Sequence, residues 1–409
     1  RNLRASHLAP LETLSDSYTD EEFWDDILKV TQGNTNQKLT RLMIQKSSSL
    51  LLWLKKRGVR YQPALSGTLS LNRTNAFFLG GGKTLLNQLY SYAERIGIEI
   101  IYDAEVQSVD LHENRIQNIV VTIKGIEMKF KIKTLIAACG GFQANEDWMR
   151  EAWGERSDNF LIRGTPYNKG TLLRALMNDQ AKTIGDPTQC HAVAIDARAP
   201  KYDGGIVSRL DCVCFGIVIN QLGQRFYDEG EDFWPKRYAI WGRLVAEQPN
   251  QIAYSIIDDK VKNHFMPSVF PPIQANNLSD LAELIGVEPK SLISTVDEFN
   301  GAVHDSDYDP AALDGRRTVG LAPNKTNWSL ALDQAPFYAY PLRPGITFTY
   351  LGLKVDDQAR VLNQQDSPFD NLFAAGEVMA GNILGEGYCA GTGMTIGGVF
   401  GLIAGENAA

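Results

Sequence analysis

The C-terminal segment, GNILGEGYCAGTGMTIGGVFGLIAGENAA, is the feature that most restricts what this chain can fold into. Its apolar character predicts a helix, yet glycine inside a helix costs up to about 1 kcal/mol relative to alanine. Such a helix needs a compensating close approach by another backbone or by a ligand. Spacing alone leaves two alternatives open: tight packing on a sheet, or a helix N-terminus whose N–H groups face an electron-rich ligand.

Two apolar runs, TLIAACGG and NLFAAGE, have the continuous hydrophobic character of strands buried on both faces. The first run ends the segment MKFKIKTLIAACGGF, in which we expect one strand whose pattern changes from alternating to continuous. Ligands of open α/β sheets bind beyond the carboxyl ends of the strands, where only small residues let the backbone approach. The sequence therefore predicts a nucleotide crevice lined by Gly140, Gly141 and Gly376.

Helical periodicity is clearest near the start of the chain. Residues 20–32 and 37–58 predict two helices, because apolar residues recur at spacings of three and four. The glycine triplet at residues 80–82 leads into a further amphipathic helix. Residues 98–125 then alternate as strands that the turn HENR interrupts.

The middle of the chain has a different texture, with aromatic-rich loops, proline-rich connections and short helices. A chain of 409 residues also exceeds the roughly 250 to 300 residues at which single cores stop growing. We therefore expect an α/β fold in which residues 1–144 and 336–409 form one domain, and residues 145–335 form an inserted α+β domain.

The net charge of −8 argues against nucleic-acid binding, which depends on a basic surface. Any anionic ligand must therefore be held by a local cluster of cations. The five cysteines are odd in number and lack CxxC spacing, so we expect neither a disulfide framework nor a metal site. No apolar run reaches the roughly 18 residues of a membrane span, and a reducing, cytoplasmic location is predicted.

Several motifs resemble one flavoprotein superfamily. NLFAAGEVMAG followed by GEGYCAGTGMTIGGVFGLIAG is similar to the C-terminal flavin motif of fumarate reductases and 3-ketosteroid dehydrogenases. TNAFFLGGGKTLLNQLY and YDAEVQSVD resemble their other FAD segments, and longer strings such as NFLIRGTPYNKG and LRPGITFTYLGLKV resemble tricarballylate dehydrogenases. The resemblance implies a Rossmann-like FAD-binding domain interrupted by a substrate or capping domain. It also implies oxidation of tricarballylate to cis-aconitate.

The resemblance breaks at the N-terminus. Members of this superfamily open with a strand and a GxGxxG turn that cradles the FAD pyrophosphate, whereas this sequence begins with RNLR in what we expect to be a polar loop. The resemblance therefore implies that the first βαβ unit is absent from this sequence, and we predict that an N-terminal segment is missing. Without it, the pyrophosphate cradle and the central strand are lacking.

The resemblance also transfers FAD contacts to individual positions. Val106 is expected next to the adenosine, and Ala138 and Gly140 in the loop after the buried strand. For Glu377 the alternative is a surface carboxylate. The full set of expected FAD contacts is Gly80, Gly81, Gly82, Val106, Ala138, Gly140, Gly376, Glu377, Gly393, Thr395 and Ile396.

A tricarboxylate carries close to three negative charges, and burying them without partners is prohibitive. Several cations must converge, since each charge-assisted hydrogen bond contributes roughly 1.5 to 3 kcal/mol. The candidates in apolar or constrained contexts are Arg163, Arg237 and Arg343, and Arg209 and His191 are weaker candidates. For each of them the alternative is a structural salt bridge or a solvated charge.

The resemblance suggests two candidates for the base. Arg237 falls where fumarate reductases carry the arginine that exchanges the substrate proton, and Tyr388 falls at a catalytic tyrosine of ketosteroid dehydrogenases. Phe348 replaces a substrate histidine, and Arg209 replaces the acidic member of the proton relay. We expect the base to remove a proton next to a carboxylate while the adjacent carbon gives a hydride to flavin N5.

Other interpretations remain open. A ketosteroid-type or fumarate-type oxidoreductase is an alternative, as is a truncated, non-catalytic paralog. By resemblance, the electron acceptor is a separate iron–sulfur, membrane-associated partner. Such a partner places the protein in the cytoplasm at the inner face of the membrane.

Overall fold

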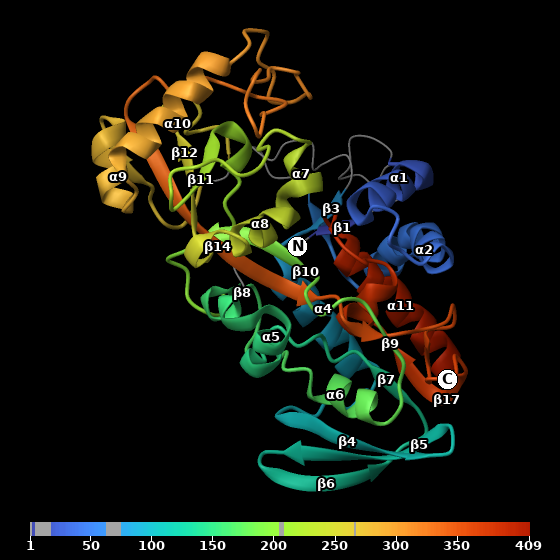
Figure 1. Ribbon diagram of the computed structural model, residues 1–409. Coiled ribbons are helices and arrows are strands. Elements are labelled where there is room, and N and C mark those ends of the chain that lie inside the picture. Colours follow the sequence, from blue (N-terminus) through green and yellow to red (C-terminus); the bar gives the residue numbers. More distant parts are fainter. Residues whose placement is uncertain (1, 5–17, 63–74, 204–207, 266) are drawn as a thin grey trace.

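The computed structural model describes residues 2–4, 18–62, 75–203, 208–265 and 267–409 (Figure 1). Near the N-terminus, α1 (Asp20–Thr31) and α2 (Gln37–Lys56) confirm the two predicted helices. Thr19 caps α1 and forms a reciprocal capping box with Glu22, which fixes where the helix begins. Both helices turn apolar residues toward the main core, including Phe23 and Ile27 of α1.

The glycine triplet leads into a helix as expected, since β3 (Asn75–Phe78) is followed by α4 (Gly81–Arg95). Gly80 connects them with a φ of 76°, a left-handed conformation that favours glycine. β1 (Asn2–Arg4) and β2 (Tyr61–Gln62) both pair antiparallel with β3. The expected loop at RNLR is therefore wrong for residues 2–4, because their backbone groups complete a small sheet.

Three antiparallel strands follow: β4 (Ala104–His112), β5 (Arg115–Ile123) and β6 (Ile126–Lys131). They confirm the alternating strands and the turn at HENR. The expectation of one strand across MKFKIKTLIAACGGF is wrong, because its alternating half is β6 and its continuous half forms β7 (Leu135–Ala137) in another sheet. The change of periodicity marks the boundary between two strands with different burial.

The second apolar run forms β17 (Pro368–Ala374), which lies between β16 (Arg360–Leu362) and β7. β17 and β7 pair in parallel, with Leu372 opposite Leu135, so that segments far apart in the sequence share one sheet. Ile136 of β7 is 40% exposed, and within the described residues β7 pairs only with β17. The domain boundaries at 144/145 and 335/336 stay a prediction.

A larger sheet contains β10 (Cys190–Asp196), β14 (Phe337–Thr349), β12 (Ala253–Ile257) and β11 (Ile217–Asn220) in that order. β8 (Leu161–Ile162) and β13 (Ile273–Ala275) also pair with β14. On one face of this sheet, α9 (Leu278–Ile285) and α10 (Pro289–Ala302) enclose a separate apolar cluster. β14 is long and runs from that lobe toward the end of the molecule that holds α11 and β17 (Figure 1).

The remaining elements are short or terminal. The short ones are α5 (Glu146–Trp153), α6 (Thr171–Asn178), β9 (Thr183–Ile184), α7 (Trp234–Arg237), α8 (Trp241–Ala246) and β15 (Gly352–Leu353). The glycine-rich C-terminus forms α11 (Thr392–Ala408). Gly397 faces Gly376, and a Cβ built on Gly397 lies 3.7 Å from the Cα of Gly376. The helix therefore approaches the turn after β17 backbone to backbone, one of the two explanations that the sequence left open.

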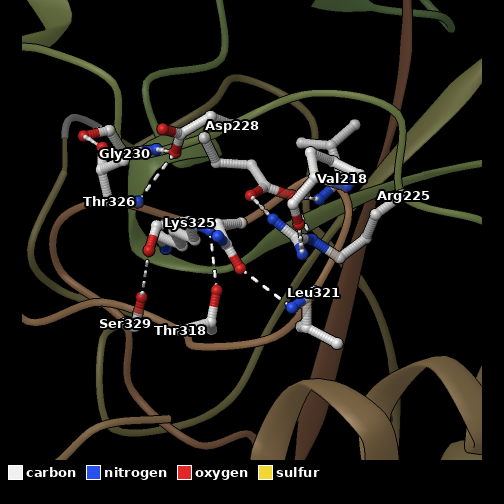
Figure 2. A network of polar contacts seen from close by, with 12 residues as sticks. Val218, Arg225, Asp228, Gly230, Thr318, Leu321, Lys325, Thr326 and Ser329 are labelled. Atoms are coloured by element: carbon white, nitrogen blue, oxygen red, sulfur yellow. Dashed lines mark hydrogen bonds and ion pairs between the residues drawn. The ribbon is translucent and has the colours of Figure 1, made fainter. Parts of the chain in front are cut away.

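A polar network fixes the loop between β11 and α7 (Figure 2). Lys325 is fully buried, and its Nζ donates to the carbonyls of Cys214, at 2.9 Å, and Gly216, at 2.7 Å. Beside it, Arg225 and Glu229 form a buried ion pair, and the Glu229 carboxylate also accepts from the backbone N–H of Val218. This cluster, which we call the Lys325 network, satisfies its buried charges with protein groups.

None of the helices in the described part of the chain is long and apolar enough to cross a bilayer.

Candidate active site

A cavity of about 580 Å³ lies where the end of β14, the glycine turn before α4 and the first turn of α11 meet. The turn after β17, η5 (Gly376–Asn382), closes another side. The cavity is lined by Gly80, Gly81, Gly82, Lys83, Arg163, His191, Arg209, Tyr238, Thr347, Phe348, Gly376, Glu377, Ala380, Tyr388, Gly393, Met394 and Ile396.

One side of the cavity consists largely of backbone. Of the predicted FAD contacts, it gathers Gly80, Gly81, Gly82, Gly376, Glu377, Gly393 and Ile396. Gly393 lies in the first turn of α11, and a Cβ there would lie 3.0 Å from the Phe348 ring. The beginning of α11 therefore combines the two alternatives that the sequence left open. It packs closely against Phe348 of β14, and it presents bare backbone to a cavity.

Glu377 is held firmly at the cavity wall. Its carboxylate accepts from the backbone N–H of Thr349 at 3.1 Å and from the side-chain amides of Gln143 and Asn168. Burial raises the pKa of Glu377 to about 7, although these hydrogen bonds act in the opposite direction. A Cβ on Gly141 would lie 2.2 Å from the Glu377 carboxylate, so this arrangement requires glycine at that position.

Arg163 is a half-buried cation that lines the same cavity. Its Nη1 donates to the Thr347 hydroxyl at 3.0 Å, and its Nε has no hydrogen-bond partner among the described residues. No ion pair joins it to a carboxylate within the part of the chain that the structure describes. Burial, followed by the positive charge of Arg209, lowers the pKa of Arg163. Such a group is costly unless an anion meets it.

Arg209 has a carboxylate partner within the protein. Its Nε and Nη2 each lie 2.7 Å from an oxygen of Asp211, and the indole of Trp234 donates to the same carboxylate. Burial acts to lower the pKa of Arg209, but the charge and hydrogen bond of Asp211 raise it. The guanidinium also lies 4.8 Å from the centre of the Tyr238 ring, within cation–π distance. Arg209 therefore stays charged and well oriented.

Aromatic rings line the cavity together with the two arginines. His191 and Tyr388 stack with ring centres 3.7 Å apart, and the Phe348 ring meets both of them edge-on. The Tyr388 hydroxyl accepts from the backbone N–H of Gly393 at 3.2 Å. Burial raises the pKa of Tyr388 well above its usual value, so the phenol is protonated at neutral pH.

Arg237 and Arg343, by contrast, lie outside the residues that line this cavity. Arg237 is ion-paired with Glu231 at 2.6 Å and hydrogen-bonded to Tyr227, in a neighbouring pocket of about 190 Å³. Arg343 donates to the backbone carbonyls of Asn250 and Gln251. Both arginines thus have the salt-bridge or structural environment that was the alternative for each candidate.

The other predicted FAD contacts also lie outside the cavity lining. Val106 belongs to β4, in the antiparallel sheet, and Ala138 is exposed just after β7. Gly140 faces the side chain of Asn168, and the Thr395 hydroxyl bonds to the carbonyl of Gly391 within α11. Their assignments stay predictions that rest on the resemblance.

Sequence reasoning missed several residues of the lining. Tyr238 directly follows the predicted Arg237, but α7 ends there and a 3-10 turn begins, so the two side chains point to different pockets. Lys83 follows the glycine triplet, and Thr347 precedes Phe348 on β14. Lys83 and Thr347 lie within quoted motifs and Tyr238 follows a predicted residue, so the sequence located these segments but did not show which of their side chains face the cavity.

The chain belongs to the FAD binding domain family, whose profile matches residues 7–395. FAD is thus the cofactor of this fold, and the chain lies within the fumarate reductase and ketosteroid dehydrogenase flavoprotein superfamily.

Three similar proteins illustrate this membership. The NADH:fumarate oxidoreductase of Klebsiella pneumoniae (strain 342) is 25% identical over 402 residues, which cover 95% of this chain and 41% of that protein. A 3-ketosteroid-Δ4-(5α)-dehydrogenase from Rhodococcus jostii RHA1 superposes with a TM-score of 0.75 at 19% identity, covering 100% of this chain and 87% of that one. The open conformation of a flavocytochrome c3 fumarate reductase gives a TM-score of 0.71 at 22% identity, covering 96% and 67%. The chain therefore spans less than half of the length of the first relative.

The residues present fit the flavin end of FAD. Gly376 leaves room for a flat ring next to the cavity, since a Cβ there would meet only the Cα of Gly397, at 3.9 Å, and Glu377 offers a fixed acceptor at its edge. The glycines before α4 and the first turn of α11 would hold the ring through backbone contacts. The expected absence of a GxGxxG turn concerns the pyrophosphate end, which these residues do not form.

Proposed function

We propose that this protein catalyses flavin-dependent hydrogen transfer at a carbon–carbon bond next to a carboxylate, and that tricarballylate oxidation to cis-aconitate is the reaction. The supporting observation is that Arg163 and Arg209 face the same cavity as the glycines that fit a flavin. Bound FAD supplies a two-electron acceptor for hydride. The protein's own part is to bind the carboxylates, orient the carbon chain and move one proton.

Arg163 is the proposed anchor for a substrate carboxylate, because this half-buried cation has a buried Nε without a hydrogen-bond partner and no carboxylate partner in the described chain. Arg209 is the proposed second contact, and its pairing with Asp211 holds the guanidinium in place. As the proton leaves the carbon, negative charge grows on the adjacent carboxylate, and fixed guanidiniums stabilise that charge. A third carboxylate would reach Lys83 at the rim, which is exposed.

The test is anaerobic mixing of the FAD-loaded protein with tricarballylate, followed at the flavin absorption band near about 450 nm. We expect the band to bleach with tricarballylate and not with 4-androstene-3,17-dione. Bleaching by the steroid alone would overturn the carboxylate assignment. No bleaching by any of tricarballylate, succinate or the steroid would favour the non-catalytic alternative.

Ketosteroid chemistry remains the second candidate, because Tyr388 lines the cavity beside Phe348. Two guanidiniums that line the same cavity count against it, since an uncharged steroid would leave Arg163 without an anion. We further propose that electrons leave through a separate iron–sulfur, membrane-associated partner. In the described residues no three His, Cys, Asp or Glu side chains gather as they would around a metal ion.

A further inference from the structure

His191 stands out in the cavity wall because its polar atoms have no protein partner. Neither ring nitrogen makes a hydrogen bond among the described residues, although only 3% of the residue is exposed. Buried polar groups in folded proteins are almost always hydrogen-bonded. Because the ring lines the cavity, the missing partner belongs to whatever the cavity binds.

The charges around His191 keep it unprotonated. Burial, followed by the positive charges of Arg163 and Arg209, holds the pKa of His191 well below its usual range. From the other elements, the ring meets Phe348 of β14, Tyr388 before α11 and Tyr238 of the 3-10 turn η3 (Tyr238–Ile240).

Those neighbours contribute no opposing charge. Burial raises the pKa of both Tyr238 and Tyr388, so both phenols are neutral at physiological pH. From α8, Arg243 donates to the side chain of Gln189, and it lines the neighbouring pocket rather than this cavity. The guanidiniums of Arg163 and Arg209 are thus the charges that lower the proton affinity of the imidazole when no anion is bound, and Asp211 already offsets part of the charge of Arg209.

We propose that His191 is the catalytic base and that substrate binding activates it. The substrate carboxylates neutralise Arg163 and Arg209, and the imidazole then accepts a proton more readily. This inference rests on the function proposed above.

The step balances as follows. A ring nitrogen of His191 takes the proton from the carbon next to the carboxylate, and the electron pair of that C–H bond becomes the new C=C bond. The neighbouring carbon gives its hydrogen with two electrons to bound FAD. When the carboxylate product leaves, the arginines again repel the imidazolium proton, which departs to water. In the direction of reduction the same ring donates the proton.

The two bases suggested by resemblance are less suited to accept this proton. Tyr388 is a protonated phenol whose oxygen already accepts from Gly393. Arg237 is paired with Glu231 outside the cavity lining, and that partner raises its pKa against the effect of burial. An arginine acts as a base only when its charged form is strongly disfavoured.

Calorimetry can test this proposal without turnover. Titrating cis-aconitate into the FAD-loaded protein, in buffers of different ionisation enthalpy at pH 7, measures the protons taken up on binding. We expect uptake of less than one proton per ligand, because neutralising the arginines raises the proton affinity of the imidazole while a neutral fraction remains to accept the proton from carbon. His191→Gln should lose this uptake and slow flavin reduction by tricarballylate at least about 100-fold.

The matched control is His264→Gln, because His264 is an exposed histidine beside Tyr308. It should keep both the uptake and the rate. Equal uptake in wild type and His191→Gln, or none in wild type, would overturn the inference while leaving carboxylate binding intact. Failure of cis-aconitate, tricarballylate and malonate to bind at all would instead overturn the proposed function, and this inference with it.

If His191→Gln does not fold, histidine imidazole NMR of the wild-type protein decides. The buried ring should be the one that stays neutral down to low pH in the ligand-free protein. Its signals should shift to those of imidazolium when malonate is added near pH 6. Unchanged signals in saturating malonate would overturn the proposal.

Discussion

The Lys325 network and the cavity both bury cations, but they treat them in opposite ways. Lys325 donates to two backbone carbonyls, and Arg225 beside it is paired with Glu229 (Figure 2). In the cavity, the Nε of Arg163 and both nitrogens of His191 lack a partner among the described residues. The difference teaches that the first cluster stabilises the fold, whereas the second has hydrogen-bonding capacity left for a ligand.

The largest expected effect is on ligand binding. Arg163→Gln should weaken binding of cis-aconitate or malonate about 100-fold to 1000-fold, because two or more charge-assisted hydrogen bonds are lost. Its melting temperature should stay the same or rise, since a half-buried cation without a carboxylate partner is removed. Calorimetry and thermal unfolding check the two parts. Unchanged affinity would show that Arg163 is structural, like Lys325.

Lys325→Met should give the opposite pattern. It leaves the carbonyls of Cys214 and Gly216 without their donor, which costs about 1–3 kcal/mol each and is partly offset because a buried charge is removed. We expect the free energy of unfolding to fall by about 2 kcal/mol in chemical denaturation, with carboxylate affinity unchanged. Retained stability would mean that this network contributes little to the fold.

The same lysine should also make stability depend on pH. Burial lowers the pKa of Lys325 to about 8, below its value in an unfolded chain. Between about pH 8 and pH 10.5 the unfolded chain therefore holds more protons, and the free energy of unfolding rises with pH through this window, by on the order of 3 kcal/mol. Denaturation at several pH values measures the rise. Lys325→Met should lack it, and an identical rise in that variant would contradict the assignment.

The smallest expected effect is that of Arg237→Ala. Its guanidinium pairs with Glu231 outside the cavity lining, so we expect flavin reduction to slow less than about tenfold. The measurement is stopped-flow reduction of the flavin by tricarballylate. Arg343→Ala is the control, because Arg343 is another arginine outside the cavity lining. A loss above about 1000-fold would restore Arg237 as the base that the resemblance implies.

Much of the architecture could be predicted from the sequence because it depends on local periodicity. Apolar spacing located α1 and α2, and the glycine triplet located the start of α4. The strand at MKFKIKTLIAACGGF was predicted wrongly, because periodicity does not say in which sheet a strand finds its partners. Only the parallel pairing with β17 separates β7 from β6.

The site was predicted less evenly than the fold. Glycines and arginines stood out by type and context, so Gly393, Arg163 and Arg209 were found, and they do line one cavity. Whether Arg237 or Tyr238 faces the cavity depends on where α7 ends and the following 3-10 turn begins. Nothing local in the sequence reports that a histidine is left without partners, because that depends on every element packed around it.

The single strand β14 has a mechanical consequence. Its register with β12 ties it to the lobe of α9 and α10, while its last residues bring Thr347 to Arg163 and Thr349 to Glu377. A displacement of that lobe along the strand would therefore move the contacts of both Arg163 and Glu377 in the cavity. The positions of Arg163 and Glu377 in the cavity are therefore coupled through the single strand β14.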